Sequence, residues 1–278
     1  MSGLAGVRVA VLESRRSAEL AQLIRRQGGE PWCVPALVEE VPEDENAVHG
    51  QLEQILAFRP TLLVAMTGGG VQRLHAAAHA HAMWPVMLRA LHGTRVVARG
   101  PKPAGALRAL GVSVAQVVPS PYTTAATVEL LGALPLGGAR VVILHAGEHN
   151  PVVSDAVRNA GATVLDVRLY RWALPAEYAL ALRAVVAELV DDDPPAIAFT
   201  AAAQVQHLLA VADAMRARAA LVQALRCRVL VAAVGPTCAE ALRAVGVEPQ
   251  VVPTHPKMGP MVVALARYAG ALSETSSG

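Results

Sequence analysis

The chain has 278 residues, 54% of them hydrophobic, and a formal net charge of +2 at pH 7, which suits one or two domains with real cores and gives no electrostatic basis for binding nucleic acid. Its apolar runs are short and broken by Gly or Pro, so we expect no transmembrane helix, and its first residues do not resemble a signal peptide. Three scattered cysteines, Cys33, Cys227 and Cys238, fit reduced thiols in a cytoplasmic protein rather than a disulfide framework.

Short apolar runs alternate with Ala- and Leu-rich segments through the first part of the chain. Residues 7–12 are apolar except for Arg8, which is typical of a buried parallel strand. Ser14 is a candidate N-cap for a helix over residues 15–27, which Gly28 and Gly29 end. Further strands are predicted at residues 31–35, 62–66, 95–98, 114–118, 141–144 and 163–170. Further helices are predicted at residues 48–58, from 71 to 82, and at 102–110, 123–131 and 151–160.

The same alternation continues to the C-terminal end. Strands are predicted at residues 196–199, 229–234 and 251–253, and helices at 177–190, after each of the first two of these strands, and at 259–268. Residues 273–278 are small and polar, so we expect them to be disordered. Strands that alternate with helices in this way predict parallel sheets.

The chain also repeats itself. Residues 98–112 read A-R-G-P-K-P-A-G-A-L-R-A-L-G-V, and residues 233–247 read A-V-G-P-T-C-A-E-A-L-R-A-V-G-V. Weaker echoes at nearly the same offset relate residues 65–70 to 198–203 and residues 9–12 to 141–144. A fixed offset indicates duplication and therefore two similar α/β domains, with a ligand cleft expected between them. Each half could fold alone, or the first β-α-β unit could cross over and pack with the last part of the chain. The periodicity does not distinguish these two arrangements.

Three sets of residues carry a resemblance to a known family. They are residues 234–236 with 239–243 and Gly246, the Thr200 loop after the run 197–199, and residues 167–172 with Tyr170. In this order and spacing, the chain resembles uroporphyrinogen-III synthases over nearly its whole length. The resemblance implies an α/β fold of two similar doubly wound parallel-sheet (flavodoxin-like) domains joined by a two-stranded linker. One domain would comprise residues 1–35 plus 174–278, and the other residues 36–173.

The resemblance also implies an activity. Members of the family close the linear tetrapyrrole hydroxymethylbilane to uroporphyrinogen III, with inversion of the last ring and loss of water, and use no metal or organic cofactor. The implied protein is a cofactor-independent hydro-lyase of haem, sirohaem or cobalamin biosynthesis, a cytoplasmic monomer with neither nucleic acid nor membrane as a partner. Tyr170 matches the family's tyrosine before the second linker strand and is implied as the catalytic acid. A phenol titrates near pH ~10 and can donate a proton to a departing hydroxyl.

An octacarboxylate substrate requires local anion donors, because the chain lacks a strong basic field. Four loops follow strands and open helices, where unbonded N–H groups and the helix dipole favour anions. The predicted substrate-binding residues are Arg15 after the first strand, Thr67, Gly68, Gly69, Gly70, Arg99, Gly100, Lys102, Thr200, Ala201, Ala202, Gly235, Pro236, Thr237 and Cys238. Alternatively, the glycines serve only tight turns and Tyr170 is an aromatic residue at a hinge.

Other candidate sites are weaker. His75, His79 and His81 lack the companions of a zinc motif and predict no metal site. His145 and His149 flank a polar loop that contains Glu148 and could contact substrate, although polar loop residues of no special role are the simpler interpretation.

Two departures from the family pattern keep a second function open. Ala201 stands where many members carry Ser, and Cys238 stands where Thr is common. Residues 255–259 are similar to a subgroup in which a synthase-like module precedes a winged-helix domain. The alternative function is therefore a non-catalytic ligand-sensing module of a transcriptional regulator. A periplasmic-type binding protein is a third interpretation, which the missing export signal disfavours.

Overall fold

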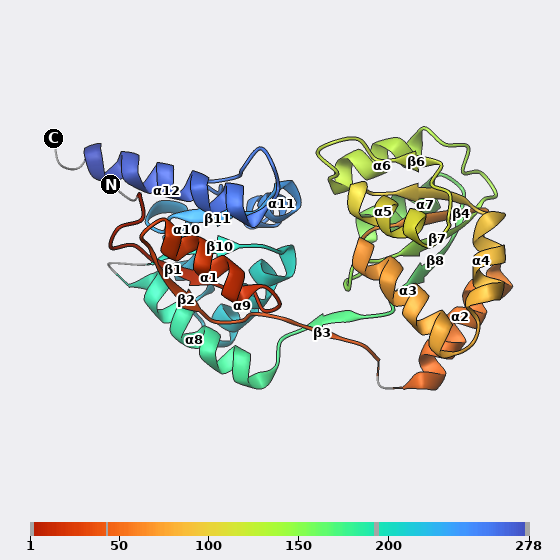
Figure 1. Cartoon of the computed structure of the whole chain (residues 1–278), viewed down its shortest axis with the longest axis horizontal. Helices are drawn as coiled ribbons and strands as arrows, with labels where there is room; N and C mark the ends of the chain where they lie inside the picture. Colours follow the sequence, from red (N-terminus) through yellow and green to blue (C-terminus); the bar gives the residue numbers. More distant parts are fainter. Residues whose placement is uncertain (1–2, 43, 192–194, 276–278) are drawn as a thin grey trace. The chain divides into compact units, whose positions relative to one another are not determined.

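The computed structural model describes residues 3–42, 44–191 and 195–275, and these residues group into two compact units (Figure 1). Unit 1 comprises residues 1–38 and 173–278, and unit 2 comprises residues 39–172. The sequence-based division, at residues 36 and 174, falls close to these limits. That each unit is a domain able to fold by itself stays a prediction.

Unit 1 is built on a parallel sheet of four strands. In spatial order these are β11 (Val231–Ala233), β10 (Ala196–Phe199), β1 (Arg8–Val11) and β2 (Glu30–Cys33). β1 pairs with β10 on one side and with β2 on the other. A strand in this central position is buried on both faces, which explains why all of its residues after Arg8 are apolar.

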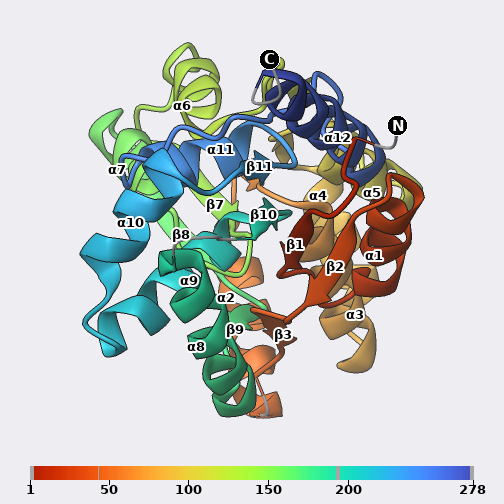
Figure 2. The same cartoon turned by 90° about the vertical axis from the view of Figure 1, so that its left-hand side faces the viewer.

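Helices cover both faces of this sheet. α1 (Ser17–Arg26) and α12 (Met258–Thr275) lie on one face. The other face is covered by α8 (Ala176–Val190), α9 (Ala202–Ala214), α10 (Arg218–Cys227) and α11 (Pro236–Arg243) (Figure 2). Val9 and Val11 pack with the first group and Ala10 with the second, because successive strand residues point to opposite faces.

Unit 2 has a parallel sheet of five strands. Their order is β6 (Gln116–Val117), β5 (Arg95–Ala98), β4 (Leu62–Ala65), β7 (Arg140–Leu144) and β8 (Thr163–Val167). One face carries α2 (Glu45–Phe58), α3 (Gly68–Ala80), α4 (Trp84–His92) and α5 (Pro101–Ala109). The other carries α6 (Thr124–Gly132) and α7 (Pro151–Asn159). Leu63 packs toward the first group and Val64 toward the second.

The chain passes between the units twice, along β3 (Val38–Glu40) and β9 (Arg171–Ala173). These two strands pair as a two-stranded sheet. Arg171 Nε donates to Glu40 Oε2 at 2.8 Å across this pair. The two-stranded connection is the one expected near residues 35–37 and 172–174.

The two sheets repeat one strand order. The order β11-β10-β1-β2 of unit 1 corresponds to β5-β4-β7-β8 of unit 2, and this correspondence matches the sequence echoes. Val251 forms an isolated parallel bridge with Ala232, in the position that β6 holds in unit 2. The doubly wound α/β class is therefore confirmed. The pairing of β1 with β10 also decides the packing that the periodicity left open, since residues before 38 join residues after 173.

The structure corrects several predicted elements. α4 and α10 were missed, the predicted strand 163–170 ends at Val167, and the predicted strand at 251–253 is only the bridge at Val251. α12 continues to Thr275 instead of becoming disordered from residue 273, and it packs against the N-terminal segment, where Gly3 approaches Gly270. Residues 276–278 lie outside the described part. Among the described helices, none combines the length and apolarity that crossing a bilayer needs.

Candidate functional site

The switch point of the unit 2 sheet is where a ligand site is expected. β4 and β7 are neighbours, but the chain leaves β4 into α3 on one face and leaves β7 into α7 on the other. Helices that depart to opposite faces leave a crevice beyond the carboxyl ends of the two strands, and ligands bind there in open α/β sheets. The residues that border this crevice come from residues 67–70 and residues 145–150.

Thr67 caps α3 and leaves two N–H groups without an acceptor. Its Oγ1 accepts a hydrogen bond from the Gly70 N–H at 3.0 Å. The N–H groups of Gly68 and Gly69, the first two residues of the helix, have no acceptor within the described ranges. Unbonded N–H groups and the positive end of the helix dipole favour an anion at this point.

Tyr170 lies directly beside this helix start. Its Oη is 3.2 Å from Thr67 Oγ1, and a Cβ added at Gly69 would lie 3.7 Å from the same Oη. The side chain is only 3% exposed, although it follows the end of β8. The tyrosine predicted as the catalytic acid is thus held with its phenol at the N-terminus of α3.

Residues 145–150 form the wall against which Tyr170 packs. Gly147 has φ +81°, and a Cβ there would lie 2.9 Å from Tyr170 Cε2 and 2.8 Å from the ring of Trp172. Trp172 meets Tyr170 edge-on, at 5.4 Å between ring centroids, and its Nε1 donates to Ala146 O at 3.0 Å. Only glycine fits position 147, because both its backbone and its neighbours exclude a side chain.

A buried histidine fixes that loop. His145 is fully buried; its Nδ1 accepts from the Asn150 N–H at 3.3 Å, and its Nε2 lies 2.7 Å from Asp166 Oδ1. This arrangement requires the neutral tautomer with the proton on Nε2. Burial lowers the pKa of His145, although the hydrogen bond and the charge of Asp166 act in the opposite direction.

Asp166 is the acceptor at the centre of this network. Ser154 Oγ donates to its Oδ1 at 2.6 Å, and Arg158 forms an ion pair with its Oδ2. Burial by itself would raise the pKa of Asp166, but the hydrogen bonds from Ser154 and His145 and the charge of Arg158 outweigh it and lower the pKa. The carboxylate therefore stays ionised, and both of its oxygens have partners.

The same network contains the one group of potential metal ligands in the described part of the chain. One donor atom each of His145, His149 and Asp166 lies within 4.8 Å of the others. However, Arg158 and Ser154 already occupy the carboxylate, and a cation would have to displace a guanidinium. We therefore regard this network as structural. The other candidate histidines, at 75, 79 and 81, form ring contacts. One of these joins His75 to Trp84, with 4.6 Å between ring centroids.

In unit 2, residues 99–102 lie against residues 67–70. A Cβ added at Gly68 would lie 3.2 Å from Lys102 O, so the start of α3 packs on the start of α5. Gly100 lies under Tyr122, which a Cβ would approach to 3.3 Å, and the Arg99 N–H is bonded to Ala65 O. Residues 67–70, residues 99–102 and Tyr170 thus lie together in unit 2; that they contact substrate stays a prediction.

The corresponding loops of unit 1 are occupied by the protein's own side chains. Gln204 Oε1 accepts from the N–H groups of Thr200 at 2.7 Å and Ala201 at 3.2 Å. The expectation of unbonded donors is therefore wrong at Thr200 and Ala201. These contacts do not involve the N–H of Ala202, the first residue of α9. Glu13 Oε1 accepts from the Arg15 and Arg16 N–H groups.

The last predicted loop, residues 235–238, offers fewer backbone donors than its four residues suggest. Pro236 has no N–H, and the Cys238 N–H is bonded to Gly235 O at 3.1 Å. The Cys238 side chain is 3% exposed, and burial raises the pKa of its thiol to about 12. The thiol is therefore a neutral core group. The N–H groups of Gly235 and Thr237 have no acceptor among the described residues. Gly235 packs closely on Pro256.

The fold defines a class, the two-unit α/β proteins with a crevice at the switch point of a parallel sheet, which is where open α/β sheets bind ligands. A family model described as "Uroporphyrinogen-III synthase HemD" matches residues 18–263. The chain belongs to this family, as the sequence resemblance predicts.

The chain is also similar to solved structures and to a relative of uncharacterized function. A crystal structure of a mutant uroporphyrinogen III synthase from the extremely thermophilic bacterium Thermus thermophilus is 29% identical, covers 96% of this chain and 99% of that chain, and has a TM-score of 0.78. The uroporphyrinogen-III synthetase of Helicobacter pylori 26695, 14% identical with a TM-score of 0.51 and coverages of 96% and 99%, shares the fold. The uncharacterized protein YjjA of Bacillus subtilis (strain 168) is 30% identical over 266 residues, 96% of this chain and 97% of YjjA.

Sequence reasoning missed most of the buried network. The sequence predicts His145 and His149 only as polar loop residues, and no motif marks Ser154, Arg158 or Asp166. These groups are separated by 8 to 21 residues along the chain, and neither spacing nor periodicity links a loop histidine to an acidic residue within a strand. The one available signal is the charged Asp166 between the apolar residues Leu165 and Val167 of β8.

Proposed function

We propose that the protein is a uroporphyrinogen-III synthase, which closes hydroxymethylbilane to uroporphyrinogen III without a cofactor. Membership of the family supports this proposal. The observation that carries it is the Tyr170 phenol, held at hydrogen-bond distance from Thr67 and beside the unbonded N–H groups at the start of α3.

In the proposed mechanism, Tyr170 is the catalytic acid. Its phenol donates a proton to the terminal hydroxyl of the substrate, the C–O bond breaks, and water leaves. The resulting azafulvene cation is attacked by the substituted carbon of the last ring to give a spiro intermediate. That intermediate fragments and recloses in the inverted sense. The phenolate left on Tyr170 is stabilised by the Thr67 hydroxyl and by the positive end of the α3 dipole, until a proton lost from the product restores it.

The proposal assigns substrate carboxylates to the helix starts. In unit 2 these are the N–H groups of Gly68 and Gly69, with Thr67, Gly70, Arg99, Gly100 and Lys102 around them. In unit 1 we assign Ala202 and Thr237 as backbone donors, with Thr200, Ala201, Gly235, Pro236, Cys238 and Arg15 shaping the loops. A hydrogen bond from such a donor to a charged group contributes ~1.5–3 kcal/mol.

The test is conversion of freshly prepared hydroxymethylbilane by the purified protein. The product isomers are separated after oxidation to porphyrins. We expect the type III isomer in excess over the spontaneous type I isomer. Formation of type I alone, at the rate seen without protein, would overturn the proposal. Inactivity combined with binding of uroporphyrinogen III would instead favour the ligand-sensing module.

A further inference from the structure

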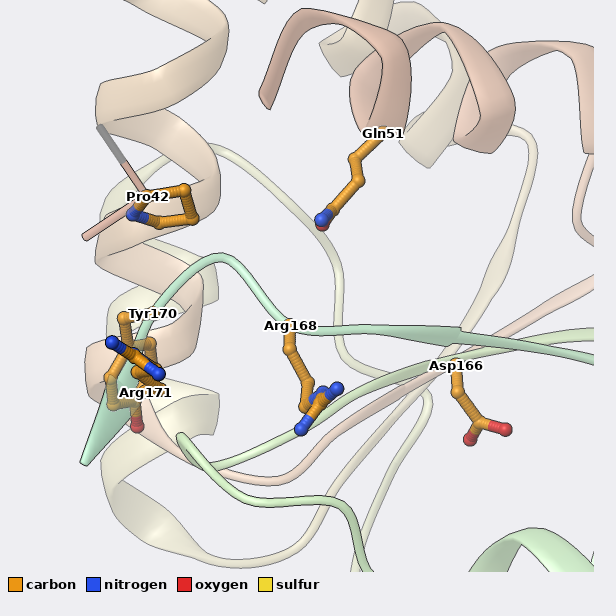
Figure 3. Close-up of a pocket in the computed structure, with 6 residues that line it drawn as sticks. All are labelled: Pro42, Gln51, Asp166, Arg168, Tyr170 and Arg171. Carbon is orange, nitrogen blue, oxygen red and sulfur yellow. The ribbon is translucent and has the colours of Figure 1, made fainter. Parts of the chain in front are cut away.

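Unit 2 contains a cavity of about 390 Å³ beside Tyr170. It lies at the free edge of β8, between the chain that follows this strand and the first half of α2 (Figure 3). Its lining residues are Pro42, Gln51, Asp166, Arg168, Tyr170 and Arg171. The volume is at the lower end of the ~300–1,000 Å³ typical of small-molecule sites, so it suits one ring with its substituents rather than a whole tetrapyrrole.

One of the cations that line this cavity has no charged partner among the described residues. Asp166 is engaged by Arg158, Ser154 and His145, and Arg171 is paired with Glu40 at 2.6 Å. Arg168 forms no ion pair and no side-chain hydrogen bond with any residue that the structure describes. A guanidinium in this situation is suited to a carboxylate, which it can bind through two parallel hydrogen bonds.

The cavity wall also contains an acceptor that lacks a donor. Gln51 Oε1 is buried and has no hydrogen-bond partner within the described residues. Figure 3 shows the Gln51 side chain extending from α2 toward the segment that carries Arg168. A buried acceptor of this kind gains if its amide turns toward the cavity and accepts from an incoming N–H.

We infer that this cavity binds one carboxylate-bearing pyrrole ring. Arg168 takes a carboxylate arm, and Gln51 accepts from the pyrrole N–H, a group that donates and cannot accept. A ring held there lies beside Tyr170, whose side chain is shared between the cavity and the start of α3. The inference rests on the proposed function for the identity of the ring, and it adds Arg168 and Gln51 as substrate-binding residues that neither the sequence motifs nor the switch-point loops indicate.

The probe is porphobilinogen, a single pyrrole with one acetate and one propionate arm, titrated into the purified protein by calorimetry. We expect Arg168→Gln to weaken its binding about tenfold or more, the loss expected for one charge-assisted hydrogen bond. Arg108→Gln removes an exposed charge from α5 of the same unit, outside the cavity, and should leave the affinity unchanged. Equal weakening by both variants would mean a general charge effect and would overturn the inference.

Gln51→Leu tests the second contact. Because it removes a buried acceptor without a partner, we expect the free protein to melt at a higher temperature while porphobilinogen binds more weakly. Glutarate, a dicarboxylate without an N–H, should depend on Arg168 and not on Gln51. If Gln51→Leu leaves porphobilinogen affinity intact, or glutarate binds as tightly as porphobilinogen, no pyrrole is recognised there and the inference fails.

Failure of this inference differs from failure of the proposed function. If the wild type forms the type III isomer and Arg168→Gln changes neither KM nor porphobilinogen affinity, the function stands and the pyrrole site does not. If the wild type is inactive but porphobilinogen binding depends on Arg168 and Gln51, the site stands without the activity.

Discussion

The switch points of the two units share one strand order but differ in what fills them. In unit 1, Glu13 accepts from two N–H groups at the start of α1 and from the Thr200 hydroxyl, and Gln204 takes the N–H groups of Thr200 and Ala201. In unit 2, the corresponding Thr67 caps α3, faces Tyr170, and leaves the next two N–H groups without an acceptor. The duplicated backbone creates both crevices, and the side chains decide which donors remain for a ligand.

The loop that follows β1 in unit 1 and the loop that follows β7 in unit 2 differ in the same way. Glu13 follows β1 and brings a carboxylate to the start of α1, whereas His145 follows β7 and brings a neutral ring, which accepts from the N–H of Asn150, the N-cap of α7, and donates to Asp166. A carboxylate at a helix start satisfies the groups that a substrate carboxylate would satisfy. We therefore expect unit 2 to contribute more to substrate binding and chemistry than unit 1.

The largest effect expected from this comparison is at Tyr170. Tyr170→Phe removes the proposed proton donor while keeping the ring between Gly147 and Trp172. We expect kcat to fall on the order of 10²–10⁴-fold, the usual contribution of general acid catalysis, with little change in KM. Tyr268→Phe, on the 39% exposed tyrosine of α12 in unit 1, is the control and should match the wild type. Unchanged turnover in Tyr170→Phe would remove this residue from the mechanism.

The next effect tests the wall behind Tyr170. Gly147→Ala introduces a Cβ into the rings of Tyr170 and Trp172, and displacement of a catalytic group by about 1 Å can cost on the order of 100-fold in rate. Gly111→Ala has a similar φ of +77° but nothing within 4 Å of the new Cβ. Both variants should lose ~1–2 kcal/mol of stability from the backbone conformation, and only Gly147→Ala should also lose kcat. Equal kcat in the two would show that the wall does not position Tyr170.

A third prediction concerns the pH dependence of stability in unit 2. The pKa of His145 is lowered from 6.5 by burial, so the unfolded chain binds a proton that the folded chain refuses. The free energy of unfolding should therefore fall as the pH drops below about 6.5. The lowered pKa of Asp166 adds a loss only at more acidic pH, below its ordinary 3.8. Urea titrations of the wild type between pH 7 and 5 measure the first slope.

Two variants test whether His145 is the source of this pH dependence of the free energy of unfolding. His145→Gln should cost ~1–3 kcal/mol at pH 7, because Asp166 and Asn150 lose a partner, and should flatten the dependence between pH 7 and 5. Ser154→Ala should lose stability through Asp166 but keep the slope, because His145 still titrates. If His145→Gln retains the wild-type slope, the histidine is not its source.

The smallest effect is expected in unit 1. Glu13→Gln removes a negative charge from the unit 1 switch point while keeping an acceptor for the Arg15 and Arg16 N–H groups. Weakened repulsion of a polycarboxylate should lower KM about two- to fivefold at low salt with kcat unchanged, as for ~0.5–1 kcal/mol. Glu177→Gln, an exposed change on α8, controls for net charge. A raised KM would mean that the Glu13 carboxylate organises the loop for substrate.

Local patterns predicted much of the fold. The apolar runs identified most strands of both sheets, because a strand buried on both faces reads as an uninterrupted apolar segment. The helices α4 and α10 were missed because each follows another helix without a strand between them. The second part of the predicted strand 163–170 does not pair with β7, and its Tyr170 packs against Gly147.

The sequence by itself determined the α/β class, the duplication and the family, because burial periodicity and motif order are local properties that survive divergence. Only the tertiary structure decided which helix starts keep unbonded donors. Glu13 reaches Thr200 across 187 residues, and Tyr170 reaches Thr67 across 103, so the partner that occupies or frees a donor cannot be read from the residues beside it. Hydrogen bonding of a helix start depends on which distant side chain the fold places against it.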